Sequence, residues 1–329
     1  MERGWERAYS FRRVSQAEAE GFVRLALHSA KVARVEPLTA GLRNTNYRVE
    51  LVEGRALVLR MYTADPSACA RESAILAALA GRVPVPRVLH SEPSADPPFS
   101  LFDWIEGKPL DGLLAEIRAS SSGSERAHGH AAPQIAFACG SALAAIHALR
   151  FPNPGFFGPD LAVAMPMPDW DAAVLSALEA AEPRLGPRLA GALRRTVESN
   201  ARAVHGVWSE AALVHADFKP WNLLYAVDAD GAAATYRLAG VVDWEFACAG
   251  CRLIDFGTFL RDEARHAAGG FTEAFVDGYE AAGASLPPDW RRLTLLVDLL
   301  SLVQMSAWAR GRGLQDIVRL LTESERRLS

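Results

Sequence analysis

The sequence predicts an α+β fold with two lobes, a small β-rich N-terminal lobe and a larger, mainly helical C-terminal lobe. Strand and helix patterns alternate over the first hundred residues, and helical patterns dominate the remainder. A length of 329 residues suits two domains or one large bilobal domain. An extended segment near residues 104–107 separates the two patterns, so we expect an N-terminal lobe of residues 1–103 and a C-terminal lobe of residues 104–329.

The N-terminal lobe is expected to hold two helices and a set of strands. Helical spacing of apolar residues predicts helices at about residues 14–30 and 68–79. Apolar alternation before and after the turn signal Glu53-Gly54 predicts a β-hairpin. The strands expected here are at residues 47–51, 56–62, 87–90 and 99–104.

The C-terminal lobe is expected to be helical, with one β-rich interruption at residues 212–244. We see no internal repeat in it. The predicted helices are at residues 134–149, 168–181, 186–208, 268–283, 287–309 and 313–327.

Composition narrows the class of protein. The formal net charge is −4, from 35 basic and 39 acidic residues, which argues against a nucleic-acid binder. Four cysteines are too few for a disulfide scaffold and indicate a reducing compartment. No signal peptide is visible, and no apolar stretch is long enough to cross ~30 Å of hydrocarbon. We therefore expect a cytoplasmic monomer or homodimer without nucleic-acid or membrane partners.

A concentration of polar residues in the β-rich region indicates a reaction centre. Within residues 213–225, two apolar runs flank a polar loop that contains His215, Asp217, Lys219 and Asn222. A second segment, residues 238–245, is an apolar strand that ends in two carboxylates, which belong to Asp243 and Glu245. A carboxylate at a strand end beside an Asp/Asn loop suits Mg²⁺, which takes one or two carboxylates and leaves positions for phosphates and water.

The spacing His215-x-Asp217-x-x-x-x-Asn222 is that of the catalytic loop of protein kinases, and Asp243 stands where their metal-binding aspartate would be. The whole arrangement resembles the aminoglycoside phosphotransferase and choline kinase group, small-molecule kinases with a protein-kinase-like fold. The resemblance extends over roughly residues 35–265.

The resemblance implies roles for these residues. Asp217 would be the catalytic carboxylate that orients the acceptor hydroxyl and takes its proton, and Asn222 and Asp243 would hold Mg²⁺ against the phosphates of ATP or another nucleoside triphosphate. Lys219 would neutralise charge on the transferring phosphoryl group, or it is a solvated loop lysine. Glu245 would add a metal contact, directly or through water. We expect His215 to brace the loop.

The resemblance also implies a nucleotide site in the N-terminal lobe. Residues 39–46 resemble the family's nucleotide loop, with Gly41 and Asn44 approaching the phosphates. Arg60 and Glu72 resemble the ion pair between a strand lysine and a helix glutamate in kinases, with arginine in place of lysine.

Residues 99–107 resemble the hinge between the lobes. In that interpretation the backbone of Asp103 and Ile105 meets the edge of adenine, and Phe102 lines the back of the pocket. The alternative is an interior strand whose aromatic side chains only pack.

Two other motifs are expected to be structural. Asp255-Phe256-Gly257 has the letters of the protein-kinase metal motif, but it heads a helical pattern, so we expect Asp255 to cap that helix or brace the catalytic loop. Cys248 and Cys251 form a CxxC pair without the second pair or nearby histidine that a zinc site needs.

The function that the resemblance implies is ATP- and Mg²⁺-dependent phosphoryl transfer to a hydroxyl of a small molecule, such as an antibiotic, an amino alcohol or a sugar-like acceptor. The alternatives are a protein kinase, which the lack of an Ala-Pro-Glu motif after Asp243 disfavours, and a non-catalytic binding module with a kinase fold.

The acceptor pocket is expected in the helices after Asp255, where 11 acidic and 10 basic residues give no excess charge to attract a polycation. The candidate lining residues are Asp262, Glu263, Trp308 and Trp290, or else the 152–170 segment with Phe156, Phe157 and Trp170.

Overall fold

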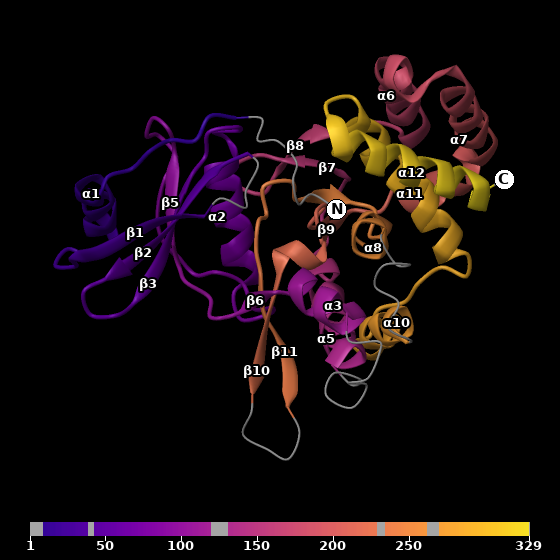
Figure 1. Cartoon of the computed structure of the whole chain (residues 1–329). Helices are drawn as coiled ribbons and strands as arrows, with labels where there is room; N and C mark the ends of the chain where they lie inside the picture. Colours follow the sequence, from indigo (N-terminus) through magenta and orange to yellow (C-terminus); the bar gives the residue numbers. More distant parts are fainter. Residues whose placement is uncertain (1–8, 39–42, 120–130, 229–233, 262–269, 329) are drawn as a thin grey trace.

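The computed structural model describes residues 9–38, 43–119, 131–228, 234–261 and 270–328. An antiparallel sheet with two helices forms the N-terminal part, and most helices gather in the C-terminal part (Figure 1). This arrangement confirms the predicted α+β fold with a β-rich first part and a helical second part.

The N-terminal sheet has five antiparallel strands in the order β1-β2-β3-β5-β4. Alternation along each strand separates its two faces. On β3, Leu57, Leu59 and Met61 enter the core that β2 and α1 share, whereas Val58 and Arg60 point to the other face. The strands are β1 (Val32–Leu38), β2 (Thr45–Leu51), β3 (Ala56–Met61), β4 (Val88–Glu92) and β5 (Phe99–Asp103).

One helix covers each face of this sheet. Helix α1 (Gln16–Ala26) begins with a capping box between Ser15 and Glu18 and places the buried Val23 in the same core as Leu57. Helix α2 (Ala68–Leu79) packs on the opposite face and connects it to the large core of the C-terminal part. Because side chains alternate along β3, Arg60 lies on the face that α2 covers, and α2 carries Glu72.

The C-terminal part combines long helices with two small sheets. Its helices are α3 (Leu110–Ala119), α5 (Ala131–His147), α6 (Trp170–Leu185), α7 (Pro187–Trp208), α8 (Leu253–Leu260), α10 (Phe271–Ala281), α11 (Trp290–Ser306) and α12 (Gly311–Leu328). One sheet joins β6 (Lys108–Pro109), β10 (Leu223–Asp228) and β11 (Thr235–Val241). The other joins β7 (Gly155–Phe157), β8 (Val163–Pro166), β9 (Ala212–Val214) and β12 (Cys248–Gly250). No helix among the described residues is both long and apolar enough to cross a membrane.

The expected helices form with shifted ends. The helix expected at residues 14–30 is the shorter α1, and the one expected at 268–283 is described from Phe271 onwards. Strands β1, β6, β7, β8 and β12 and helix α3 were not predicted individually. Strands β6, β7, β8 and β12 have only two to four residues, too short a pattern to show a strand period.

Helices α5 and α10 approach each other closely because each has a glycine at the contact. A Cβ atom at Gly140 would lie 2.0 Å from the carbonyl oxygen of Phe275, and one at Gly278 would lie 2.1 Å from that of Phe137. These distances leave no room for a methyl group unless the helices separate.

We expect Gly140→Ala to lower the free energy of unfolding by about 2–4 kcal/mol, because the methyl group must push apart two packed backbones. Gly191→Ala in α7 is the matched control. Its Cβ would have only the far end of Arg195 within 4 Å, so we expect a gain of about 0.5–1 kcal/mol from helix propensity. Denaturant unfolding measures both, and equal effects would contradict the close helix contact.

Candidate active site

The loop between β9 and β10 carries the predicted catalytic residues and is fixed by Asp255. This carboxylate is fully buried in the first turn of α8, and its two oxygens accept the backbone N–H groups of His215, at 2.8 Å, and Ala216, at 2.7 Å. Ala216 has a φ of 62°, in the left-handed region that non-glycine residues seldom adopt. Asp255 therefore braces the loop. It is not the N-cap residue of α8, which is Arg252.

Two histidines brace the same region as neutral groups. His147 Nε2 lies 3.0 Å from Asp255 Oδ2, and its Nδ1 lies 3.0 Å from the hydroxyl of Tyr279. Burial lowers the pKa of His147 although Asp255 opposes that change. His215 Nε2 can only donate to the carbonyl of Val242, at 3.1 Å, so its Nδ1 accepts the N–H of Asp217. Both rings therefore serve as hydrogen-bonding braces.

Asp217 is held by the other two predicted catalytic residues. Asn222 Nδ2 donates to Asp217 Oδ2 at 2.8 Å and to the Asp217 carbonyl oxygen at 3.0 Å. Lys219 Nζ lies 2.9 Å from the same Oδ2. Asn222 sits in the single turn η1 (Pro220–Asn222) and is buried, whereas the Asp217 side chain keeps 17 % of its surface exposed. The sequence spacing thus produces a pre-oriented carboxylate with an accessible edge.

Arg60 links the N-terminal sheet to the second carboxylate segment. Its Nη2 lies 2.6 Å from Asp243 Oδ1, and its Nε lies 3.2 Å from Glu72 Oε2. Burial disfavours the charged guanidinium, but Glu72 and Asp243 outweigh it and raise the pKa of Arg60 well above its ordinary value. Asp243, which has a φ of 69°, keeps 31 % of its side-chain surface exposed.

Glu72 is itself fixed by groups that the sequence did not single out. The Tyr62 hydroxyl donates to its Oε2 at 2.6 Å, and the backbone N–H of Trp244 donates to its Oε1 at 3.0 Å. Tyr62 follows Arg60 by two residues, and the alternation of side chains along a strand predicts that both lie on one face. The Trp244 contact joins residues 172 positions apart and has no local signal.

Glu245 points away from solvent and towards Asn44, in the segment predicted to be the nucleotide loop. Asn44 Nδ2 donates to Glu245 Oε2 at 2.8 Å, and Arg43 Nε lies 3.5 Å from Oε1. Burial, and then the nearby charge of Asp243, raise the pKa of Glu245 to about 7. For Asp243, burial is outweighed by Arg60, so the pKa of this carboxyl is lowered. The two neighbouring carboxylates therefore differ in protonation near neutral pH.

The donor set suits Mg²⁺. Asp243 offers a partly exposed carboxylate, and Asn222 offers an amide oxygen because its nitrogen is already donating to Asp217. Among the described residues, no group of three or more His, Cys, Asp or Glu side chains is placed to hold a metal ion. Few protein ligands, all of them oxygens, fit a cation that keeps water and phosphate ligands.

The predicted hinge runs from β5 into the segment before β6. Phe102 is buried and pairs with Val58 on β3. Asp103 bridges Arg55 and Arg87 through its carboxylate, and its N–H donates to the Arg87 carbonyl. The N–H of Ile105 makes no hydrogen bond to a described residue. Gly41 lies outside the described residues.

The residues expected to face the acceptor lie in different surroundings in the structure. Trp290 lines a pocket between α8, α11 and α12, whereas Trp308 is not among the residues that line it and is 52 % exposed. Phe157 and Trp170 are buried in the core, and Phe156 is exposed. Asp262 and Glu263 lie outside the described residues.

The CxxC pair is structural, as expected. Cys248 and Cys251 are buried free thiols, and burial raises the pKa of each to about 12. Thiols that stay protonated are poor nucleophiles and poor metal ligands at neutral pH.

Comparison with solved structures supports the fold. A thermostable mutant of aminoglycoside phosphotransferase APH(4)-Ia, in complex with ADP and hygromycin B, is similar with a TM-score of 0.64 and 17% identity, over 94% of this chain and 97% of that one. The GDP and kanamycin complex of APH(2")-IIia has a TM-score of 0.66 and 19% identity, over 93% and 98%. Macrolide 2'-phosphotransferase MphH from Brachybacterium faecium has a TM-score of 0.60 and 19% identity, over 92% and 98%.

A search of curated protein sequences finds no significant match. The family model described as phosphotransferase enzyme family, by contrast, matches residues 34–296, which include Arg60, the catalytic loop and both carboxylates of the second segment. The match covers most of the chain and agrees with the resemblance seen in the motifs. The chain therefore belongs to the phosphotransferase enzyme family.

Proposed function

We propose that this enzyme uses ATP, or another nucleoside triphosphate, and Mg²⁺ to phosphorylate a hydroxyl of a small molecule in the cytoplasm. The observation that carries the proposal is the convergence of Arg60 from the N-terminal sheet, the pre-oriented Asp217 and the partly exposed Asp243. A binding module without catalytic function would have no need for an accessible, pre-oriented Asp217.

Asp217 orients the acceptor hydroxyl and takes its proton. Its Oδ2 is held by Asn222 and Lys219, which fixes the carboxylate, and the exposed part of its side chain would face the acceptor. Lys219 places a positive charge next to the position of the transferring phosphoryl group. Phosphoryl transfer depends mainly on such positioning and charge neutralisation.

Asn222 and Asp243 would hold Mg²⁺, and Glu245 would support it through water or through its contact with Asn44. The bound ion would neutralise the phosphate charge. Arg60, oriented by Glu72, would contact the phosphates beside it.

We place the nucleotide between the N-terminal lobe, residues 1–103, and the C-terminal lobe, residues 104–329. Gly41 and Asn44 belong to the loop that would cover the phosphates. Phe102 would close the back of the adenine pocket, with the carbonyl of Asp103 and the N–H of Ile105 at the adenine edge.

We expect Asp217→Asn to lower turnover by roughly 10²–10⁴ because the amide cannot take the proton. Nucleotide affinity should stay within about twofold, because Asp217 contacts the acceptor. The measurement is steady-state ADP release with an acceptor found by screening, together with calorimetry of ATP binding. Asp228→Asn, on the exposed end of β10, is the control that should leave turnover unchanged. Near-normal turnover in Asp217→Asn would remove this residue from the role.

We expect Asp243→Ala and Asp255→Asn to separate metal binding from stability. Asp243→Ala should abolish the tightening of ATP binding by Mg²⁺. Asp255→Asn replaces one of two acceptor oxygens by a donor and should cost about 2–4 kcal/mol of stability while the Mg²⁺ effect remains. Calorimetry of ATP binding with and without Mg²⁺, beside thermal unfolding, measures both. The reverse pattern would make Asp255 the metal ligand.

We expect Glu245 to make the metal-free protein less stable as the pH rises from about 4.5 to 7. In this window the unfolded chain has lost the Glu245 proton and the folded chain, with a pKa of about 7, still binds it. In Glu245→Gln, the free energy of unfolding should fall by about 1–3 kcal/mol less over this pH range than in the wild-type protein. Urea unfolding at pH 5 and pH 8 in EDTA measures it. A decline of equal size in the variant would show that Glu245 is ionised in the folded state throughout.

A further inference from the structure

The N-terminal segment, residues 9–14, lies before the first residue that the family model matches, yet it is attached to the strand that leaves the predicted nucleotide loop. The backbone N–H of Arg12 donates to the Thr45 hydroxyl at 3.1 Å. The Tyr47 hydroxyl accepts the N–H of Val14 at 3.0 Å and donates to the carbonyl of Arg12 at 2.9 Å. These bonds hold the segment against the start of β2.

At the start of this segment, Tyr9 contacts the guanidinium group of Arg43. The guanidinium carbon of Arg43 lies 5.5 Å from the centre of the Tyr9 ring and 5.0 Å from the centre of the Phe246 ring. Both distances are within the limit of about 6 Å for a cation–π contact. Tyr9 is 40 % exposed and Phe246 is 43 % exposed, so neither ring belongs to the buried core. Their contacts with Arg43 therefore need a reason other than core packing.

Arg43 joins these two rings to the proposed nucleotide site. Its Nε lies 3.5 Å from Glu245 Oε1, and the side chain of the next residue, Asn44, donates to Glu245 Oε2 at 2.8 Å. The carbonyl of Arg43 accepts the Thr63 hydroxyl at 3.0 Å. Arg43 and Asn44 belong to the predicted nucleotide loop, so contacts that fix Arg43 also fix this part of the loop against the carboxylate segment.

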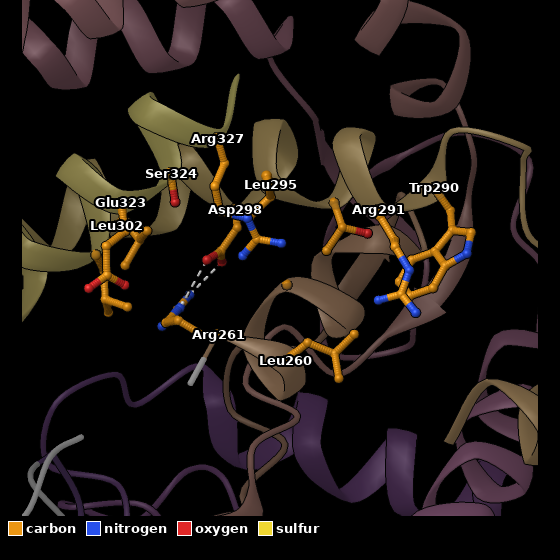
Figure 2. Close-up of a pocket in the computed structure, with 13 residues that line it drawn as sticks. Leu260, Arg261, Trp290, Arg291, Leu295, Asp298, Leu302, Glu323, Ser324 and Arg327 are labelled. Atoms are coloured by element: carbon orange, nitrogen blue, oxygen red, sulfur yellow. Dashed lines mark hydrogen bonds and ion pairs between the residues drawn. The ribbon is translucent and has the colours of Figure 1, made fainter. Parts of the chain in front are cut away.

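A second cation–π contact differs in what it connects. The guanidinium carbon of Arg291 lies 4.6 Å from the centre of the ring of Trp290, its neighbour in α11 (Figure 2). This pair is adjacent in sequence, so the contact connects nothing beyond one turn of one helix. Tyr9, Arg43 and Phe246, by contrast, come from three separate segments, and their contacts attach these segments to one another.

We propose that Tyr9 and Phe246 are positioning residues for the nucleotide, which hold Arg43 in place and so pre-organise the described part of the predicted nucleotide loop; the proposal rests on the function proposed above. A segment that is already ordered loses less conformational entropy when a ligand binds, which raises affinity. The contacts that hold Asp217 come from Asn222 and Lys219 and involve neither ring. The two rings therefore act on nucleotide binding rather than on the transfer step.

The test measures nucleotide affinity directly. Calorimetry compares the binding of ATP and of GTP, each with Mg²⁺, to the wild-type protein, Tyr9→Ser and Phe246→Ser. We expect each substitution to weaken binding of the tighter nucleotide about two- to fivefold, the effect of losing one exposed cation–π contact. Tyr9→Phe keeps the ring and should bind like the wild-type protein. In steady-state assays the KM of the nucleotide should rise while kcat and the KM of an acceptor found by screening stay unchanged. A merely structural role would lower the Tm and leave nucleotide affinity unchanged.

Arg43→Gln shows whether the rings act through Arg43. In this background Tyr9→Ser should weaken nucleotide binding no further, and a double-mutant cycle measures that coupling. Arg291→Gln removes the other cation–π contact and is the matched control, which should leave nucleotide affinity unchanged. Unchanged nucleotide affinity in both ring variants, or full additivity of Tyr9→Ser and Arg43→Gln, overturns the proposal.

The outcomes separate this proposal from the proposed function. If both ring variants bind the nucleotide like the wild-type protein, and the wild-type protein transfers a phosphoryl group, the positioning role fails and the kinase function stands. If the ring variants bind the nucleotide more weakly, but the wild-type protein phosphorylates no acceptor, the positioning role holds and the proposed function fails. If the wild-type protein binds neither nucleotide, both proposals fail.

Discussion

The geometry of the catalytic loop depends on one carboxylate, that of Asp255. It accepts two consecutive backbone N–H groups and contacts His147, all in the protein interior. The turn at Ala216 has a positive φ, which for a residue with a Cβ costs on the order of 1 kcal/mol. Without Asp255, two buried N–H groups would lack partners and cost about 1–3 kcal/mol each. The brace therefore determines where Asp217, one residue later, points.

A second set of contacts attaches the carboxylate segment to the N-terminal lobe. Arg60 contacts Asp243, Glu72 accepts the N–H of Trp244, and Asn44 donates to Glu245. Asp243, Trp244 and Glu245 are thus attached in turn to the N-terminal sheet, to α2 and to Asn44. Arg60 lies between Glu72 and Asp243, so it ties the carboxylate segment to the N-terminal sheet by charge as well as by hydrogen bonding.

The fold class and the catalytic loop could be predicted because their signals are local. The spacing of Asp217 and Asn222 is a sequence motif, and the two faces of β3 follow from alternation. The brace role of Asp255 could also be predicted. Asp255 stands at the start of a helical pattern, whereas the metal-binding aspartate is expected at the end of a strand. Helix ends and three-residue strands could not, because tertiary pairing sets them.

The rest of the site depends on contacts between distant residues. Asn44 and Glu245 are 201 positions apart, so nothing in their own segments shows that Glu245 turns from solvent towards the nucleotide loop. The same applies to Thr294, because only the packing of the helices shows that its hydroxyl is buried and has no hydrogen-bond partner among the described residues. Trp308, expected as a pocket wall from its aromatic character, is half exposed and does not line the pocket between α8, α11 and α12, so its role stays a prediction.

Helix α8 braces the catalytic loop on one face and packs against α11 on another. Asp255 and Thr258 point to the catalytic loop, and Gly257 and Arg261 point to α11. A Cβ atom at Gly257 would lie 2.9 Å from that of Asp298, so the glycine lets α11 approach closely enough for the Arg261–Asp298 pair to form. Side chains on α11 and α12 can therefore change without moving Asp255. The contact between α8 and α11 is thus made on a different face from the one that braces the catalytic loop.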